Sequence, residues 1–198
     1  KFNADGVLSI YKPKGFTSQQ IVGKIRFLLK KELKKKKVKV GHGGTLDPLA
    51  TGVLAIGIGK GCKELQEYLT GPKTYITIAK MGYDTTTEDS EGEILSKKSY
   101  LHVNNKLIEK TLNEFIGDIQ QIPPMYSAIK KDGKRLYDLA RQGITIERKP
   151  RTVTIYKIKL LPKLKSMDDS EFRFIVTCGG GTYIRTLIKD ICIKMKTK

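Results

Sequence analysis

Residues 41–52 read GHGGTLDPLATG, and this stretch carries the most specific information in the chain. Its glycines permit positive φ angles and a close approach of the main chain to neighbouring groups. Asp47 is the single carboxylate in the stretch, between Leu46 and Pro48. Aspartate beside proline is typical of turns, so the residues alone favour a turn aspartate. A carboxylate on such a loop can instead be a nucleophile, provided that a cation keeps it ionised.

Two other chemistries do not fit the residues around this stretch. Asp47 has no neighbouring acidic partner, so the paired carboxylates of glycoside hydrolysis are missing here. Residues 57–61 read GIGKG, which matches neither the Walker spacing nor the dinucleotide fingerprint. We therefore do not interpret residues 57–61 as a phosphate loop.

The composition indicates a basic globular protein. A length of 198 residues suits one domain with a real core. The net charge of +18 favours a nucleic-acid partner, because a positive surface binds phosphate polyanions and releases their counterions. An anionic membrane surface or a lysine-rich composition are the alternatives. No apolar run is long enough to span a bilayer, so we expect a soluble, intracellular protein, with nucleus, cytoplasm and mitochondrion left open.

The cysteines and histidines give no sign of a metal site. Cys62, Cys178 and Cys192 are widely spaced and form no CxxC pair, and His42 and His102 are far apart in sequence. A structural zinc site or a disulfide framework is therefore not expected, and buried or idle thiols are the better interpretation.

The periodicity of apolar residues predicts strands and helices in irregular alternation. Apolar positions at helical spacing follow a cap at Thr17 or Ser18, and the lysine-rich run 30–39 then predicts a solvated loop, with RNA contact or nuclear targeting as the alternative. No βα unit repeats, which favours α+β over a doubly wound fold. Strands are predicted at 6–11, 75–81, 153–160 and 172–178, and helices at 63–69, 105–116, 136–142 and after residue 181.

Five separated motifs resemble the TruB family of pseudouridine synthases. The stretch GHGGTLDPLATG is similar to the catalytic motif of that family. The other four follow in family order: KPKGFTS at 12–18, KTY at 73–75, PPMYSAIK at 123–130 with GKRLY at 133–137, and GTYIRTL at 181–187. The resemblance covers nearly the whole chain. We call residues 123–141 the thumb segment, after the family element that they resemble.

The resemblance implies an activity. The family isomerises uridine in RNA: the bond from ribose C1′ to N1 breaks, the base rotates, and C5 is joined in place of N1. Asp47 corresponds to the nucleophile, which attacks either the sugar or the base. Product and substrate are isomers, so neither a metal nor another cofactor is expected. The implied substrate is the T-arm of transfer RNA at the uridine usually numbered 55, and some relatives also modify messenger RNA.

The resemblance also implies roles for residues outside the loop. Arg185 corresponds to an arginine that pairs with the nucleophile and keeps it ionised. Tyr75 corresponds to a tyrosine that stacks on the flipped base and assists loss of the C5 proton. His42 corresponds to a residue that helps to extrude the base. Asp47, Tyr75 and Arg185 are thus the expected catalytic residues, and RNA contacts are expected from Lys12, His42, Lys73, Lys130, Lys134, Arg135 and Arg141.

We therefore expect an α+β fold, with a mixed, mostly antiparallel sheet flanked by helices and a thumb-like insertion. The Asp47 loop is expected in a basic cleft across that sheet. Residues 1–198 should form a single catalytic domain, a monomer, that is incomplete at its carboxy-terminal end relative to the family and has no PUA-type domain. The alternative function is a non-catalytic RNA-binding or RNA-folding module that keeps the fold.

Overall fold

The computed structural model describes residues 4–131 and 133–198 and divides them into two compact units, Lys1–Gly71 and Pro72–Lys198. Every strand pair found is antiparallel. The α+β class with antiparallel sheets is therefore confirmed, as two main sheets and two small hairpins, one of them in the thumb segment. A single domain over 1–198 stays a prediction. In the described part of the chain, no helix has the length and apolar character needed to cross a membrane.

The first unit is a three-stranded sheet with one long helix. The strand order is β1-β3-β2, and the expected strand 6–11 is confirmed as β1. Buried apolar side chains of helix α1 and of strands β2 and β3 form the core, among them Val22, Leu54 and Ile56. The bounds are β1 (Gly6–Lys12), α1 (Ser18–Glu32), β2 (Val40–His42), β3 (Gly52–Ile58), a 3-10 turn η1 (Gly59–Lys63) and α2 (Leu65–Thr70).

Helix α1 begins where its sequence predicts. Thr17 is the N-cap, and its hydroxyl accepts a hydrogen bond from the Gln20 amide at 3.1 Å. The Gln20 side chain in turn accepts from the Thr17 amide at 2.8 Å. This reciprocal capping box satisfies two amides that a helix start leaves without partners. The first helical residue, Ser18, is fixed as a result.

The second unit is a four-stranded sheet with two helices on one face. The strand order is β4-β11-β10-β7. Alternate residues of β11 from Phe172 to Cys178 are buried, which confirms the predicted shared face. Helix residues such as Leu112 of α3 and Leu187 of α5 belong to the same hydrophobic core as the buried face of β11. The bounds are β4 (Lys73–Lys80), α3 (Asn105–Asn113), β7 (Gly117–Gln121), β10 (Arg151–Leu161), β11 (Glu171–Cys178) and α5 (Ile184–Lys194).

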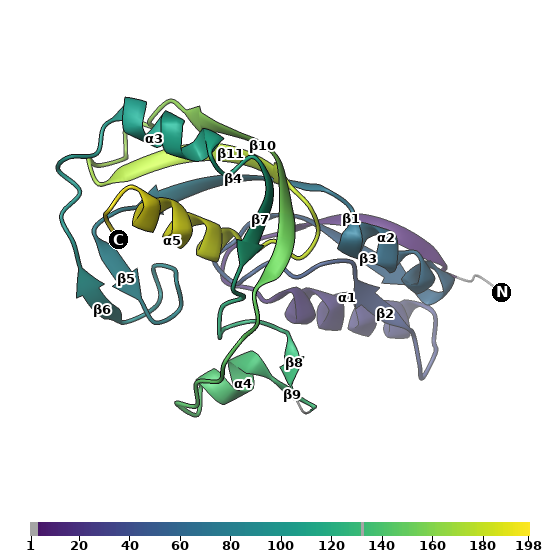
Figure 1. The fold of residues 1–198 in the computed structure, drawn as a ribbon. Helices are drawn as coiled ribbons and strands as arrows, with labels where there is room; N and C mark the ends of the chain where they lie inside the picture. The colour runs from purple at the N-terminus through teal and green to yellow at the C-terminus, as the bar shows by residue number, and fades with distance from the viewer. Residues whose placement is uncertain (1–3, 132) are drawn as a thin grey trace. The chain divides into compact units, whose positions relative to one another are not determined.

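Two smaller hairpins complete the second unit. One lies beside α5, and the other belongs to the thumb segment, which projects from the ends of β7 and β10 (Figure 1). Their bounds are β5 (Tyr83–Thr85), β6 (Ile94–Lys97), β8 (Lys130–Lys131), β9 (Lys134–Arg135) and the thumb helix α4 (Leu136–Ala140). The thumb segment begins just after β7, and residues 142–150 connect it to β10.

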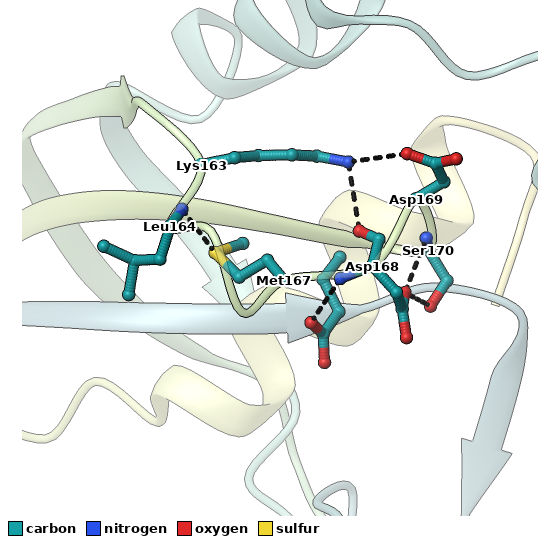
Figure 2. Close-up of polar contacts among 7 residues, drawn as sticks. Lys163, Leu164, Met167, Asp168, Asp169 and Ser170 are labelled. Carbon is teal, nitrogen blue, oxygen red and sulfur yellow. Dashed lines mark hydrogen bonds and ion pairs between the residues drawn. The ribbon is translucent and has the colours of Figure 1, made fainter.

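The turn between β10 and β11 is closed by local polar contacts (Figure 2). Asp168 accepts hydrogen bonds from both the amide and the hydroxyl of Ser170, and Lys163 donates to the Asp168 carbonyl at 3.0 Å. The Ser170 hydroxyl, followed by Lys80, lowers the pKa of Asp168 to about 2. This turn is a structural feature of the sheet and carries none of the expected site residues.

Candidate functional site

The residue that precedes Asp47 is clamped to the start of α1. The Ser18 hydroxyl donates to the Leu46 carbonyl at 3.1 Å, and the Leu46 amide donates to the Ser18 oxygen at 2.9 Å. Ser18 is buried, with 2% of its surface exposed. Since a small polar side chain satisfies both main-chain groups of Leu46, the position of Asp47 depends on the first turn of the helix.

The residue that follows Asp47 is held by the 12–18 segment as well. The Pro48 carbonyl accepts from the Gly15 amide at 2.8 Å and from the Lys12 ammonium at 3.3 Å. Lys12 also donates to the carbonyls of Pro13 and Phe16 at 3.0 and 2.7 Å. Both neighbours of Asp47 are thus fixed by one segment, which gives a physical reason for the two motifs to occur together.

The burial of Lys12 corrects one expectation. Its side chain is 0% exposed, and its three donors point to three carbonyl oxygens. Burial lowers the pKa of Lys12, and the negative charge of Asp47 opposes that effect. The expected direct contact of Lys12 with RNA does not agree with this geometry. Lys12 instead organises the Asp47 loop and places a positive charge near it.

Glycines let the loop pass close to its surroundings. A Cβ on Gly43 would lie 2.7 Å from the Tyr68 Cβ of α2, so a side chain there would collide. Gly44 has a φ of +138°, which favours glycine. His42 ends β2, and its Nδ1 atom is enclosed with no hydrogen-bond partner in the described part of the chain. Its role in base extrusion stays a prediction.

In the second unit, Arg185 is fixed by two loops. Its Nη1 donates to the Thr87 carbonyl and its Nη2 to the Tyr126 carbonyl, each at 2.8 Å. Thr87 belongs to the loop between β5 and β6, and Tyr126 to the thumb segment. Two directional contacts on different nitrogens hold the plane of the guanidinium in one orientation. Pairing between Arg185 and Asp47 stays a prediction.

A buried amide sets the turn that leads into α5. Gln121 is 1% exposed and lies at the end of β7. Its nitrogen donates to the Tyr183 carbonyl at 3.1 Å, and its oxygen accepts from the Tyr183 amide at 2.8 Å. Thr182 donates to the Gly179 carbonyl at 2.9 Å. These bonds fix the main chain two residues before Arg185.

The two expected site residues of β4 occupy its first half. Tyr75 pairs with Val176 across the sheet, is partly buried and packs against the core. Lys73 pairs with Cys178, and burial lowers the pKa of its ammonium, an effect that the Cys178 thiol opposes. Stacking by Tyr75 and RNA contact by Lys73 stay predictions.

The thumb segment gathers cations around one aromatic ring. The guanidinium carbons of Arg135 and Arg141 lie 5.6 and 5.5 Å from the centre of the Tyr137 ring, and Arg135 donates to the Tyr137 hydroxyl at 2.6 Å. Lys130, Lys134, Arg135 and Arg141 are all exposed. Exposed cations beside an aromatic ring can contact phosphates and stack with bases. The expected RNA contacts of these four residues stay predictions.

The glycine-rich stretch 57–61 has a structural explanation. Asp5 accepts a hydrogen bond from the Lys60 amide at 2.9 Å, and the Gly59 amide donates to the Lys39 carbonyl, so the first two amides of η1 already have partners. A Cβ on Gly61 would collide with the main chain of Gly6. Glycine is thus required for packing, in agreement with the rejection of a phosphate loop.

The cysteines form no disulfide among the described residues. Cys62, Cys178 and Cys192 are free thiols, and burial raises the pKa of Cys192 to about 12. Within residues 4–131 and 133–198, no group of three His, Cys, Asp or Glu side chains has the arrangement of a metal site.

Sequence reasoning missed the residues that hold the site in place. Ser18 was one of two candidates for the helix cap, a place that Thr17 takes, and its bonds to Leu46, 28 residues away, were not foreseen. Gln121 and Thr87 resembled ordinary polar residues. A buried amide at a strand end, next to the proline pair at 123–124, is the signal that could have singled out Gln121.

The chain matches one protein family over most of its length. The family described as "TruB family pseudouridylate synthase (N terminal domain)" matches residues 30–184. Proteins named tRNA pseudouridine synthase B from Pseudomonas fluorescens and Dehalococcoides mccartyi are each 47% identical, over 98% and 96% of this chain. The chain spans 60% of the length of each. A relative of the same name from Bacteroides fragilis is 44% identical over 96% of the chain and 80% of its own length.

Solved structures agree. One similar solved structure is titled "Crystal Structure of a Cbf5-Nop10-Gar1 Complex" and has a TM-score of 0.67 and 30% sequence identity to this chain. The match covers 96% of this chain and 44% of the chain in that structure. A second is titled "Structure of H/ACA RNP bound to a substrate RNA containing 2'-deoxyuridine", with a TM-score of 0.62 and 27% identity over 96% of this chain and 43% of that one. Taken with the matched motifs, these likenesses show that the chain belongs to the TruB family of pseudouridylate synthases.

Proposed function

We propose that this chain isomerises uridine to pseudouridine in transfer RNA, at uridine 55 of the T-arm, with Asp47 as the nucleophile. Membership of the TruB family supports the reaction class. The substrate is proposed because the relatives from Pseudomonas fluorescens and Bacteroides fragilis are named tRNA pseudouridine synthase B.

The observation that carries the proposal is the immobilisation of the main chain around Asp47. Ser18 binds both main-chain groups of Leu46, while Gly15 and Lys12 bind the carbonyl of Pro48. A turn aspartate with no chemical role has no need for such support on both sides. A nucleophile does, because a displacement of about 1 Å can lower a rate by on the order of 100-fold.

The proposed reaction needs only atoms of the RNA and of the protein. Asp47 attacks C1′ or the base, and the C1′–N1 bond breaks. The detached uracil rotates, and C5 bonds to C1′ as Asp47 is released. The proton on C5 is then lost to solvent, and N1 takes up one proton in its place. The product is an isomer of the substrate, so no electron or group is supplied from outside.

Arg185 and Tyr75 take the supporting roles in this proposal. The guanidinium holds Asp47 ionised, and its fixed orientation on the Thr87 and Tyr126 carbonyls supports that role. Tyr75 offers its ring to the extruded uracil and assists loss of the C5 proton, since stacking is a main device for holding an unstacked base. His42 helps to extrude the base.

Binding of the RNA is assigned to the thumb segment and to the overall charge. The net charge of +18 attracts the phosphate backbone. The cluster of Arg135 and Arg141 around Tyr137 offers both cations and an aromatic face. Messenger RNA stems of similar shape form a second proposed substrate class.

Release of the C5 hydrogen provides the test. A T-arm stem-loop carrying tritium on C5 of its uridines should release tritium to water, because C5 gains a carbon bond in the product. A stem-loop with cytidine at position 55 should release none. Tight binding of both RNAs without any release would contradict the proposal and indicate a non-catalytic RNA-binding module.

A further inference from the structure

The loop between β5 and β6, residues 86–93, contacts Arg185 through one main-chain carbonyl. The Thr87 carbonyl accepts from Arg185 Nη1 at 2.8 Å. The motifs that resemble the family do not include this loop.

The loop is internally ordered in a way that fixes the Thr87 carbonyl. The Thr86 amide donates to the Glu93 carbonyl at 3.0 Å, and the Glu93 amide donates to the Thr86 hydroxyl at 3.1 Å. Asp89 accepts from the Thr87 hydroxyl and from the Glu91 amide, the latter at 3.0 Å. A loop held by four such bonds presents its carbonyl in one direction.

The residue after Thr87 anchors the loop to the helix that carries Arg185. Thr186 donates its hydroxyl proton to Glu88 Oε2 at 2.7 Å, and Lys189 lies 3.6 Å from Glu88 Oε1. Thr186 is 5% exposed, and 16% of the Glu88 side chain is exposed. Lys189 also pairs with Asp84 of β5 at 3.0 Å. Partial burial makes these charge-assisted contacts stronger than surface ion pairs.

Two adjacent pairs of residues therefore interact between the loop and α5. Thr87 binds Arg185, and Glu88 binds Thr186. We propose that Glu88 and Thr186 are positioning residues: they hold the Thr87 carbonyl against the guanidinium of Arg185 and so orient that arginine for the reaction. This inference rests on the proposed function, because orientation matters only if Arg185 serves the reacting centre.

The expected consequence is a loss of turnover and not of RNA affinity. Without the bond from Thr186 to Glu88, the loop can withdraw, and the bond from Arg185 Nη1 to the Thr87 carbonyl is weakened. The guanidinium then samples several orientations, and fewer of them suit the transition state. RNA binding through the thumb segment does not depend on this contact.

Three substitutions separate the role of the hydroxyl from that of packing. Thr186→Val removes the hydroxyl and keeps the shape, whereas Thr186→Ser keeps the hydroxyl. Thr111→Val is the matched control, because Thr111 is 3% exposed and lies in α3 of the same unit. We expect Thr186→Val to lower kcat on a T-arm stem-loop by about 10- to 100-fold with KM within about twofold. Thr186→Ser should recover most of kcat, and Thr111→Val should leave it unchanged.

A double substitution tests the pairing. Glu88→Ala with Thr186→Val should be no slower than Glu88→Ala alone, because both remove the same interaction. Additive losses would overturn the proposal. So would an unchanged kcat in Thr186→Val, or equal losses in Thr186→Val and Thr186→Ser.

A direct readout of Arg185 keeps the inference distinct from the proposed function. Guanidinium ¹⁵N NMR, assigned with Arg185→Lys, should show separate Nη signals in the unsubstituted chain and in Thr186→Ser. In Thr186→Val these signals should merge because rotation is faster. If the unsubstituted chain forms no pseudouridine, the proposed function fails and this spectrum alone decides the positioning role. Identical spectra for all variants would overturn it.

Discussion

Ser18 and Leu46 exchange two hydrogen bonds, at 3.1 and 2.9 Å, and thereby connect the first turn of α1 to the residue before Asp47. Gly15 and Lys12 complete the support from the other side of Asp47. Hydrogen bonds from the 12–18 segment thus hold the main chain on both sides of Asp47.

Replacing Ser18 with alanine should weaken the hydrogen bonding that holds Leu46, the residue before Asp47. Ser18→Ala leaves the partly buried amide and carbonyl of Leu46 without the Ser18 hydroxyl, which should reduce the free energy of unfolding by about 1–3 kcal/mol. We expect kcat for pseudouridine formation to fall by about tenfold or more, because Asp47 is less well placed. Steady-state kinetics and urea unfolding measure both effects. The control is Ser9→Ala, an exposed serine of β1 in the same unit. Equal kinetics in both variants would contradict the role of Ser18.

Gln121 should be as important for the second unit. Gln121→Leu keeps the bulk of the side chain and removes both bonds to Tyr183. Since the partly buried Tyr183 amide loses its acceptor and the Tyr183 carbonyl keeps only the Leu187 amide as donor, we expect the free energy of unfolding to fall by about 1–3 kcal/mol. Gln120→Leu, on the exposed face of the same strand, is the control and should have a much smaller effect. A neutral outcome for Gln121→Leu in thermal unfolding would refute its role in fixing the turn.

The thumb segment should dominate the salt dependence of RNA binding. Arg141→Ala removes a cation 5.5 Å from the Tyr137 ring, and the slope of log Kd against log salt should shrink by about one phosphate contact. Lys106→Ala, which removes an exposed cation from α3, should leave the slope unchanged. Fluorescence anisotropy with a T-arm stem-loop at several salt concentrations makes the comparison. Identical slopes for both variants would argue against an RNA contact by Arg141.

Asp190 should give the protein a defined pH dependence. Burial, and next the negative charge of Glu88, raises the pKa of Asp190 to about 6, while Lys189 opposes the shift. The folded state therefore binds more protons than the unfolded state between the ordinary carboxyl pKa and about pH 6, so ionisation at Asp190 costs stability above pH 6. Asp190→Asn should stabilise the protein at pH 8 by on the order of 1 kcal/mol, allowing for partial exposure, and by much less at pH 4. Urea unfolding at both pH values is the measurement, and an equal gain at both would contradict the assignment.

The sequence predicted the elements whose apolar pattern is unambiguous. Alternation in β11 and the cap at Thr17 identified a strand and a helix start, and both are confirmed. Strand β3 was missed, because its sequence GVLAIGI contains glycines and no alternation, and it was taken for part of a glycine-rich stretch. Its central residues Leu54 and Ile56 are buried, and a continuous apolar run is ambiguous without its tertiary setting.

The candidate site likewise contains residues that the sequence identified and residues that it did not. The motifs named Asp47, Tyr75 and Arg185, since these residues are recognisable by type and context. The residues that orient them were not predicted, because their role depends on contacts between distant segments: Gln121 with Tyr183, 62 residues apart, and Thr87 with Arg185, 98 apart. Lys12, in the family-like segment KPKGFTS, was expected to contact RNA, yet three carbonyls accept hydrogen bonds from its ammonium.

The central claim is that Asp47 is the nucleophile of a pseudouridine synthase. The most direct measurement is pseudouridine formation at position 55 of a T-arm stem-loop by the unsubstituted chain, by Asp47→Asn and by Asp169→Asn. Asp169 is fully exposed in the β10–β11 turn and serves as the control. We predict product from the unsubstituted chain and from Asp169→Asn, and none from Asp47→Asn, which should still bind the RNA. Product formation by Asp47→Asn at the rate of the unsubstituted chain would contradict the account.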